Sequence, residues 1–171
     1  LINIINPYDE YAIQAALDIK KINPDSKITL LSMGPQCAKE VLEYGLALGA
    51  DSAVHLCDKR FSGADTKATS KTLAAAIKNV IKDYDIIIAG QFAIDGDTAQ
   101  TGPSLACQLN LPVLTFVKSI LDADNEKITA RCEGENEIIT METTVPCVLC
   151  VLKNNKEIKN PKIQDYINAQ N

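Results

Sequence analysis

The stretch GQFAIDGDTAQTGPSL, residues 90–105, contains the residue types that could hold a ligand. It follows the apolar run 86–88, which predicts a buried strand, and it leads into a predicted helix start. A loop between a parallel strand and a helix is where α/β proteins bind ligands. This loop has neither a GxGxxG fingerprint nor a GxxxxGK[ST] phosphate loop, and it contains no lysine or arginine.

The start of the following helix offers another way to hold a phosphate. Pro103 has no N–H group, so it must lie in the first turn of an unbroken helix, and the cap then falls between Gln100 and Gly102. Free backbone N–H groups there, together with the hydroxyls of Thr98 and Thr101, can bind a phosphate without a cation.

The two aspartates of the loop need a different role, because a carboxylate that faces a phosphate is repelled. We expect Asp95 and Asp97 to accept hydrogen bonds from the loop backbone or from ribose hydroxyls, and not to bind a metal. Gly96 and Gly102 are expected to permit close backbone approach. An alternative stays open at this point, namely that AIDGDT is only a turn built from good turn residues.

Alternating helices and strands predict a parallel sheet built from βαβ units. Asn6 is expected to cap the first helix, with Pro7 in its first position. Helices are predicted within 6–22, 36–50 and 61–84, and strands within 27–34, 52–58 and 85–90. Four further strands, predicted within 112–121, 127–133, 137–145 and 146–152, indicate an antiparallel addition to the sheet. We therefore expect an α/β nucleotide-binding domain over 1–152 and a polar tail over 153–171.

Three loops are expected to meet at the carboxyl edge of this sheet. They are the helix start Asn6–Asp9, the SMGP loop Ser32–Pro35 and the loop that begins at Gly90. Together they would form a cleft large enough for a nucleotide, lined by hydroxyls, backbone groups and carboxylates. Because these loops carry no cation, the positive partners of a bound diphosphate are expected to come from another chain.

Composition excludes several classes of protein. The net charge of −5 argues against a nucleic-acid surface, and no apolar run approaches the length of a membrane span. The lone His55, on a strand-like segment, is more typical of a core or surface residue than of a metal ligand. CVLC is predicted to be a strand, whereas a redox CxxC needs a helix N-terminus. The cysteines are expected to be buried free thiols of a reducing cytoplasm: Cys37, Cys57, Cys107, Cys132, Cys147 and Cys150.

The motifs resemble those of the small (β) subunit of electron-transfer flavoproteins. NPYDEYAIQAAL resembles the family's NP-x-x-E-x-A-x-x-x-A helix start, and LSMGP with GLALGAD resembles its strand–loop–helix segment. AGQFAIDGDTAQTGPSLA resembles its nucleotide loop, and ARCEGENEIITMETTVPCVLC resembles its hairpin. The similarity covers nearly the whole chain. By the same resemblance, the family's N-terminal strand and C-terminal arm are expected to be missing from this sequence.

The resemblance implies a fold like that of the adenine-nucleotide α-hydrolases and an electron carrier that is not itself an enzyme. It implies a heterodimer with an electron-transfer flavoprotein α subunit, and an acyl-CoA or other dehydrogenase as the redox partner. The cofactor-binding residues implied are Asn6, Pro7, Tyr8, Asp9, Met33, Gly90, Gln91, Phe92, Ala93, Ile94, Asp95, Gly96, Asp97, Thr98, Ala99, Gln100 and Thr101.

The form of the loop favours FAD over AMP as the ligand. The electron-bifurcating and nitrogen-fixation-linked branches, which hold a second FAD, tend to read A-I-D-G-D-T-A-Q-x-G-P, as residues 93–103 do. The mitochondrial type, which holds structural AMP, usually reads A-I-D-D-D-x-N-Q-T-G-Q. Phe92 departs from the family pattern, and it either alters the adenine pocket or fills core.

Other functions predict other motifs. An ATP-binding stress-type module would carry a G-x-x-G phosphate loop that ends in G-S/T, and an ATP-pyrophosphatase would carry S-G-G-x-D-S. Neither motif is present in this sequence. A structural subunit that binds AMP without a redox role remains the nearest alternative. No residue stands out as a general acid, general base or nucleophile.

Overall fold

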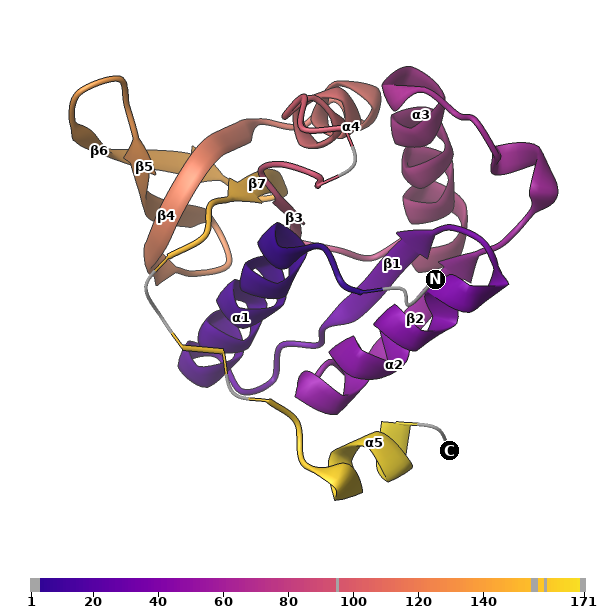
Figure 1. Ribbon diagram of the computed structural model, residues 1–171. Coiled ribbons are helices and arrows are strands. Elements are labelled where there is room, and N and C mark those ends of the chain that lie inside the picture. Colours follow the sequence, from indigo (N-terminus) through magenta and orange to yellow (C-terminus); the bar gives the residue numbers. More distant parts are fainter. Residues whose placement is uncertain (1–3, 95, 155–156, 159, 170–171) are drawn as a thin grey trace.

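The computed structural model describes residues 4–94, 96–154, 157–158 and 160–169 (Figure 1). Its helices are α1 (Pro7–Ile22), α2 (Lys39–Leu48), α3 (Thr66–Ala76), α4 (Thr101–Leu109) and α5 (Ile163–Ala169), with 3-10 turns at Gln36–Ala38 and Lys59–Phe61 and a π-helical turn at Ile77–Ile81. Its strands are β1 (Thr29–Met33), β2 (Ser52–Leu56), β3 (Ile86–Gly90), β4 (Val113–Ala123), β5 (Lys127–Glu133), β6 (Ile138–Thr144) and β7 (Cys147–Val151).

The strands form two sheets, whereas the sequence predicts one. β1 and β2 pair in parallel, and a second sheet has the order β3-β7-β4-β5-β6. Within the described residues, β1 and β3 share no ladder of hydrogen bonds. The α/β class and the parallel core are confirmed, and the expectation of one continuous parallel sheet is corrected.

The direction of β7 is a second correction. The apolar run 146–152 is predicted to join an antiparallel addition, but β7 lies between β3 and β4 and runs parallel to both. Only β4-β5 and β5-β6 are antiparallel. All five residues of β7 are buried, as expected for a strand with neighbours on both edges and helices on both faces. Its C-terminal end therefore lies beside that of β3, where Gly90 pairs with Val151.

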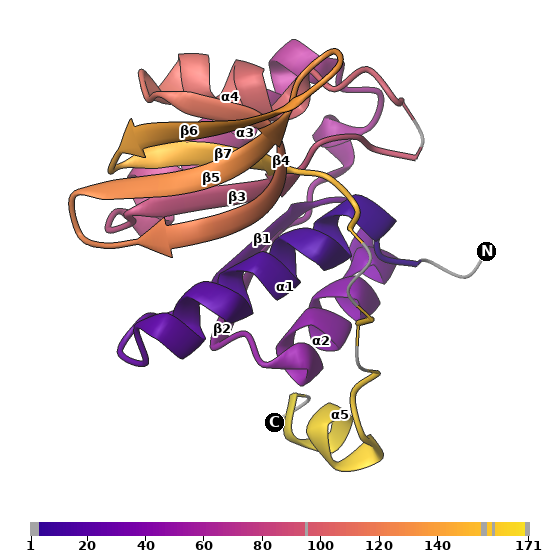
Figure 2. The same ribbon diagram turned by 90° about the vertical axis from the view of Figure 1, so that its left-hand side faces the viewer.

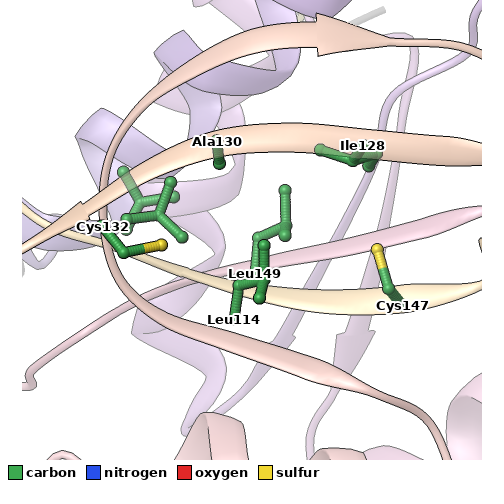
Figure 3. Close-up of a cluster of buried hydrophobic side chains, with 8 residues drawn as sticks. Leu114, Ile128, Ala130, Cys132, Cys147 and Leu149 are labelled. Carbon is green, nitrogen blue, oxygen red and sulfur yellow. The ribbon is translucent and has the colours of Figure 1, made fainter. Parts of the chain in front are cut away.

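Helices cover both faces of the larger sheet (Figure 2). On one face, Tyr11 and Ala15 of α1 pack against a cluster that includes Leu149 and Val117. On the other face, Ala106 of α4 packs against the opposite side of β7. Figure 3 shows the first cluster, in which side chains from β4, β5 and β7 point toward one another inside the curved sheet.

Local sequence signals account for where the helices begin and end. Asp65 caps α3 and accepts a hydrogen bond from the Ala68 N–H at 2.7 Å. Gly49, with φ of 123°, ends α2 inside the predicted range 36–50. α4 begins at Thr101 with Gln100 as its cap, inside the range that Pro103 predicts.

The cysteines are all free, but only half of them are buried. Cys132, Cys147 and Cys150 lie in the core, while the other three are exposed, contrary to expectation. Cys147 and Cys150 belong to clusters on opposite faces of the sheet, as their spacing in a strand predicts. Burial raises the pKa of the Cys147 thiol to about 11 and that of Cys150 to about 12, which disfavours the thiolate that redox chemistry needs.

The tail folds back on the second helix. α5 lies within the predicted tail, and its Tyr166 ring lies 6.3 Å from the Tyr44 ring of α2. Tyr44 also donates a hydrogen bond to Glu10 of α1, which links α1, α2 and α5. None of the helices in the described part of the chain has both the length and the apolar character needed to cross a bilayer.

The contact between α4 and β7 depends on Gly102. A Cβ atom at Gly102 would lie 2.3 Å from the Cys150 sulfur, whereas one at Gly96 would meet nothing within 4 Å. We predict that Gly102→Ala lowers the free energy of unfolding by about 1–3 kcal/mol, measured by denaturant titration, and that Gly96→Ala does not lower it. Adding Cys150→Ala should recover part of the loss, because the clashing sulfur is removed. Equal stability of the two glycine variants would contradict this packing.

Candidate functional site

Asn6 ties the start of α1 to the loop that follows β3. It occupies the capping position, but its side chain makes no capping hydrogen bond, contrary to expectation. Instead, its Nδ2 donates to Asp9 Oδ2 and to the Phe92 carbonyl, both at 2.8 Å. Both hydrogens of the amide are used in this way. The other amide atom, Oδ1, is buried and has no donor among the described residues.

Gly90 brings the end of β3 against the first turn of α1. Its N–H donates to Asp9 Oδ1 at 2.7 Å. A Cβ atom here would lie 2.6 Å from Tyr8 Cβ and 2.9 Å from the Asp9 backbone nitrogen. Only glycine permits this approach without displacing the helix. The prediction that the NPYD segment, residues 6–9, lies beside the loop after β3 is confirmed.

An aromatic cluster flanks this junction. The Tyr8 and Phe92 rings have centroids 5.3 Å apart, and the Phe92 and Phe116 rings have centroids 6.1 Å apart with an edge-on geometry. Phe92 therefore packs between helix α1 and strand β4. Phe116, which sequence reasoning missed, lies where the pairing of β4 shifts register, and it has a positive φ of 55°.

Gln91 holds that irregular part of β4 in place. Its side chain is buried, and its Oε1 accepts a hydrogen bond from the Phe116 N–H at 2.6 Å. Its own N–H donates to the Val151 carbonyl at 2.9 Å. The Gln91 side chain, predicted as cofactor-binding, thus bonds to the protein interior.

In the loop from Ala93 to Gln100, most of the described residues are exposed, and two of them lie in the left-handed region. Asp97 has φ of 46° and donates its N–H to the Ala93 carbonyl at 2.7 Å, and Ala99 has φ of 55°. Gln100 follows in a right-handed conformation, with φ of −99° and ψ of −22°. Alternation of left- and right-handed residues directs successive N–H groups into a concavity that can bind an anion.

The first turn of α4 leaves backbone donors open. Gln100 makes no side-chain capping bond, and the N–H groups of Thr101 and Gly102 have no acceptor among the described residues. Thr98 is exposed beside this turn, as is Ile94 farther back in the loop. The expected role of Gly102 is corrected, because the close approach it permits is to Cys150 and not to a ligand. Gly96 faces open space.

Met33 stands apart from this arrangement. Asp95 lies outside the described residues, so its predicted role stays a prediction. Met33 ends β1, and no hydrogen bond between described residues joins it to the loop after β3. His55 contacts the loop after β1, where its Nε2 lies 3.2 Å from the Gly34 carbonyl. In the described part of the chain, no three His, Cys, Asp or Glu residues are grouped to hold a metal ion.

Lys153 gives this edge a positive charge that sequence reasoning missed. Its Nζ lies 4.6 Å from the centroid of the Tyr8 ring, within the range of a cation–π contact. Because β7 is parallel to β3, the residues that follow Val151 emerge beside Gly90. The signal in the sequence was that Lys153 directly follows the run 146–152. An antiparallel direction for that run gave no reason to expect Lys153 beside Gly90.

The Asp9 carboxylate is the centre of this junction, and its removal gives a sharp test. We predict that Asp9→Ala lowers the free energy of unfolding by about 1–3 kcal/mol, because the Gly90 N–H then lacks an acceptor. Hydrogen exchange at residues 90–92 should become faster. Asp9→Asn retains one acceptor oxygen and should lose less. If exchange in this segment is the same in all three proteins, the carboxylate does not organise the loop.

Comparison with known proteins supplies the family. The model of the electron transfer flavoprotein domain matches residues 2–165. The chain is 44% identical to the electron transfer flavoprotein subunit beta of Megasphaera elsdenii, over 98% of this chain and 64% of the relative. It is 46% identical to the caffeyl-CoA reductase-Etf complex subunit CarD of Acetobacterium woodii, over 94% of this chain and 59% of that protein.

A third relative extends the range of the similarity. Protein FixA of Bradyrhizobium diazoefficiens is 40% identical over 97% of this chain and 59% of its own length. The chain thus spans about three fifths of the length of these curated relatives. The domain model and the relatives both confirm the predicted family. This chain belongs to the electron-transfer flavoprotein family, and its relatives there are β-subunit, CarD and FixA proteins.

Proposed function

We propose that this chain is the nucleotide-binding part of an electron-transfer flavoprotein β subunit and that its ligand is FAD. The ligand would lie at the edge formed by the ends of β3 and β7 and the starts of α1 and α4. The single observation that carries this proposal is the junction of Asn6, Asp9 and Gly90, which joins the predicted nucleotide loop to the first helix. Membership in a flavoprotein family supports a flavin as the ligand of this site.

The buried amide of Asn6 fits a hydrogen-bonding ligand. Its Oδ1 is buried without a donor in the described part of the chain, although both hydrogens of its Nδ2 are engaged. An unsatisfied buried acceptor costs about 1–3 kcal/mol. An N–H or O–H group of a nucleotide base or ribose would remove that cost. The residues therefore fit a nucleoside.

The start of α4 fits a phosphate. Ala99 is left-handed and Gln100 is right-handed, and among the described residues nothing accepts from the N–H groups of Thr101 and Gly102. The positive end of the helix dipole lies at the same point. These features bind anions without a charged side chain.

Lys153 supports a diphosphate over a single phosphate. The sequence suggests that all positive charge must come from another chain, but this lysine lies at the same edge, beside Tyr8. One cation offsets part of the charge of a diphosphate, and an α subunit would offset the rest. The proposed boundary between the nucleotide-binding domain, 1–152, and the tail, 153–171, thus falls at the site itself.

The proposed role is electron transfer without a catalytic residue. When bound, the flavin ring supplies the redox chemistry, and the protein supplies binding and electronic tuning. The chain's own part is to orient the nucleotide through Asn6, the loop backbone and the start of α4. The name of CarD describes a complex with caffeyl-CoA reductase, which supports an acyl-CoA-type dehydrogenase or reductase as the partner of this protein. The relatedness to CarD and FixA supports the electron-bifurcating branch.

A cytoplasmic location is part of the proposal, and it agrees with six cysteines that form no disulfide in the structure. An adenine-nucleotide α-hydrolase-like fold also remains part of the proposal. It is supported by the parallel strands β3, β7 and β4 and by the helices on both faces. AMP is the second candidate ligand, because one phosphate needs only the start of α4.

The phosphate contact predicts the effect of removing two hydroxyls. Thr98→Val combined with Thr101→Val should weaken FAD binding by roughly tenfold or more, because a hydrogen bond to a charged group contributes about 1.5–3 kcal/mol. Calorimetric titration with FAD measures the change. The matched control is Thr140→Val with Thr144→Val, at two exposed residues of β6. Equal affinity of the two double variants would remove Thr98 and Thr101 from the site.

Identification of the bound nucleotide tests the proposal most directly. The full-length protein, co-expressed with its α subunit, should release FAD from the β site on heating, with two flavins per heterodimer in total. Chromatography and mass spectrometry of the released nucleotides give both the identity and the ratio. One FAD and one AMP per heterodimer would select the AMP alternative. A complex that releases no flavin would overturn the electron-transfer role.

A further inference from the structure

Helix α3 and the π-helical turn after it carry a charge opposite to that of the chain as a whole. The segment 66–82, with the sequence TKATSKTLAAAIKNVIK, contains four lysines and no acidic residue. The whole chain has 22 acidic residues against 17 lysines and arginines, and a net charge of −5. All four lysines are exposed, and together they form the lysine stripe: Lys67, Lys71, Lys78 and Lys82. Such a concentration of one sign creates a local field that the net charge conceals.

The lysine stripe lies on the side of α3 that faces away from the core. α3 lies beside α4 at the periphery of the molecule, and Ala74 and Ile77 share a buried cluster with Leu105 of α4 (Figure 1). Lys67 and Lys71 are four residues apart, so they are neighbours on the exposed face of the helix. Neither of them forms an ion pair with another described residue. Their charges are therefore available to a partner.

The stability of α3 does not explain these lysines. Lys67 lies in the first turn, where the positive end of the helix dipole favours an acidic residue. Lys67 and Lys71 also repel each other, because like charges four residues apart destabilise a helix. Solubility does not require them either, since the net charge of −5 already supplies it. Recognition of an acidic partner explains the cluster better than the fold does.

The lysine stripe also adjoins a helix of the proposed nucleotide site. Lys78 Nζ donates to the Gln108 carbonyl, in the last turn of α4, at 3.0 Å. α4 has nine residues and begins at Thr101. A helix of that length spans about 14 Å. A protein bound to the lysine stripe would therefore lie one short helix away from the proposed ligand.

We propose that the lysine stripe docks the acidic surface of a transient redox protein that exchanges electrons with the complex. The inference rests on the proposed function, because an electron carrier must meet and leave the proteins that it serves. One electron passes between the two cofactors, so one is oxidised as the other is reduced, and no bond to this chain forms. Complementary charge accelerates such encounters, and redox complexes use small and weak interfaces.

Two other anionic partners fit the lysine stripe less well. A nucleic acid would be repelled by the acidic remainder of the chain, and the segment 66–82 has no arginine, the residue that binds phosphates with two parallel hydrogen bonds. A membrane surface needs apolar side chains beside the basic ones. Val80, at 59% exposed, is the one large apolar residue that this segment exposes. An acidic protein requires neither feature.

A charge-reversed pair and a matched control test this surface. Lys67→Glu with Lys71→Glu reverses two charges of the lysine stripe. Lys21→Glu with Lys27→Glu makes the same change in net charge at two exposed lysines outside it. Both double variants are made in the full-length protein, co-expressed with its α subunit. All four positions are exposed, so both proteins should fold, as circular dichroism and melting curves can verify.

The probes are two small haem proteins of opposite charge, the acidic cytochrome b5 and the basic cytochrome c. We expect Lys67→Glu with Lys71→Glu to weaken binding of cytochrome b5 by roughly tenfold or more at low ionic strength, and the control pair to weaken it less than threefold. Neither variant should weaken binding of cytochrome c. Biolayer interferometry measures the affinities.

Two further measurements locate the contact. Binding of cytochrome b5 to the unmodified complex should fall steeply with added salt, because charges more than about 10 Å apart are screened in roughly 0.1 M salt. Carbodiimide, which joins lysine amines to carboxylates, should cross-link cytochrome b5 to the segment 66–82. Mass spectrometry of the digested product identifies the linked lysines.

Several outcomes would overturn the proposal. These are failure of the unmodified complex to bind cytochrome b5, equal loss of its binding in the two double variants, or cross-links confined to lysines outside 66–82. Tighter binding of phosphatidylserine vesicles or duplex DNA, lost in the Lys67→Glu with Lys71→Glu variant, would assign the lysine stripe to a membrane or a nucleic acid instead.

Flavin content, measured on the same samples, separates this inference from the proposed function. A complex that contains two flavins but binds cytochrome b5 independently of the lysine stripe defeats only this inference. A complex that binds cytochrome b5 through the lysine stripe but releases no flavin defeats only the proposed function.

Discussion

The contact between Gly90 and Asp9 is the constraint on which the candidate site depends. A backbone N–H at the end of a strand donates to a carboxylate in the first turn of a helix, at a separation that leaves no room for a Cβ atom. The same carboxylate orients Asn6, and Asn6 holds the Phe92 carbonyl. A loop that begins from a fixed point has fewer conformations to lose when it binds a ligand.

The insertion of β7 between β3 and β4 connects this site to the core. β7 supplies the Val151 carbonyl that fixes Gln91, the sulfur that faces Gly102, and the strand end from which Lys153 emerges. The start of α4, the loop after β3 and Lys153 are therefore all positioned by the buried strand β7. Its two cysteines are small apolar side chains in this setting, since burial holds the pKa of each thiol well above its ordinary value.

Local signals in the sequence predicted local structure well. Pro7, Pro103 and Gly49 mark helix ends correctly because proline and glycine act through the backbone of their own residue. The direction of β7 could not be predicted, because an apolar run looks the same in parallel and antiparallel neighbours. The role of Asn6 was missed for a related reason, since capping is a local pattern and its actual partner, Phe92, is 86 residues away.

The loop at residues 90–105 was the most informative part of the sequence, but the structure tests only some of what it predicts. The start of α4 at Thr101 follows from Pro103. The position of Met33 relative to the loop depends on how β1 lies beside β3, which no short motif encodes. The choice between FAD and AMP depends on groups that only a bound ligand would engage. The proposal of FAD therefore rests on the form of the loop motif at residues 93–103.

The place of β7 in the chain also bears on how the protein forms during synthesis. β3 and β4 leave the ribosome well before β7, yet β7 is the strand that joins them. Until Val151 has emerged, the apolar edges of both strands lack their shared neighbour, and the hairpins of β4, β5 and β6 must form around an open position. Pairings between such distant segments are slow to form and expose surfaces that aggregate. The nascent chain therefore depends on β7 to close a core to which β3, β4 and β5 already belong.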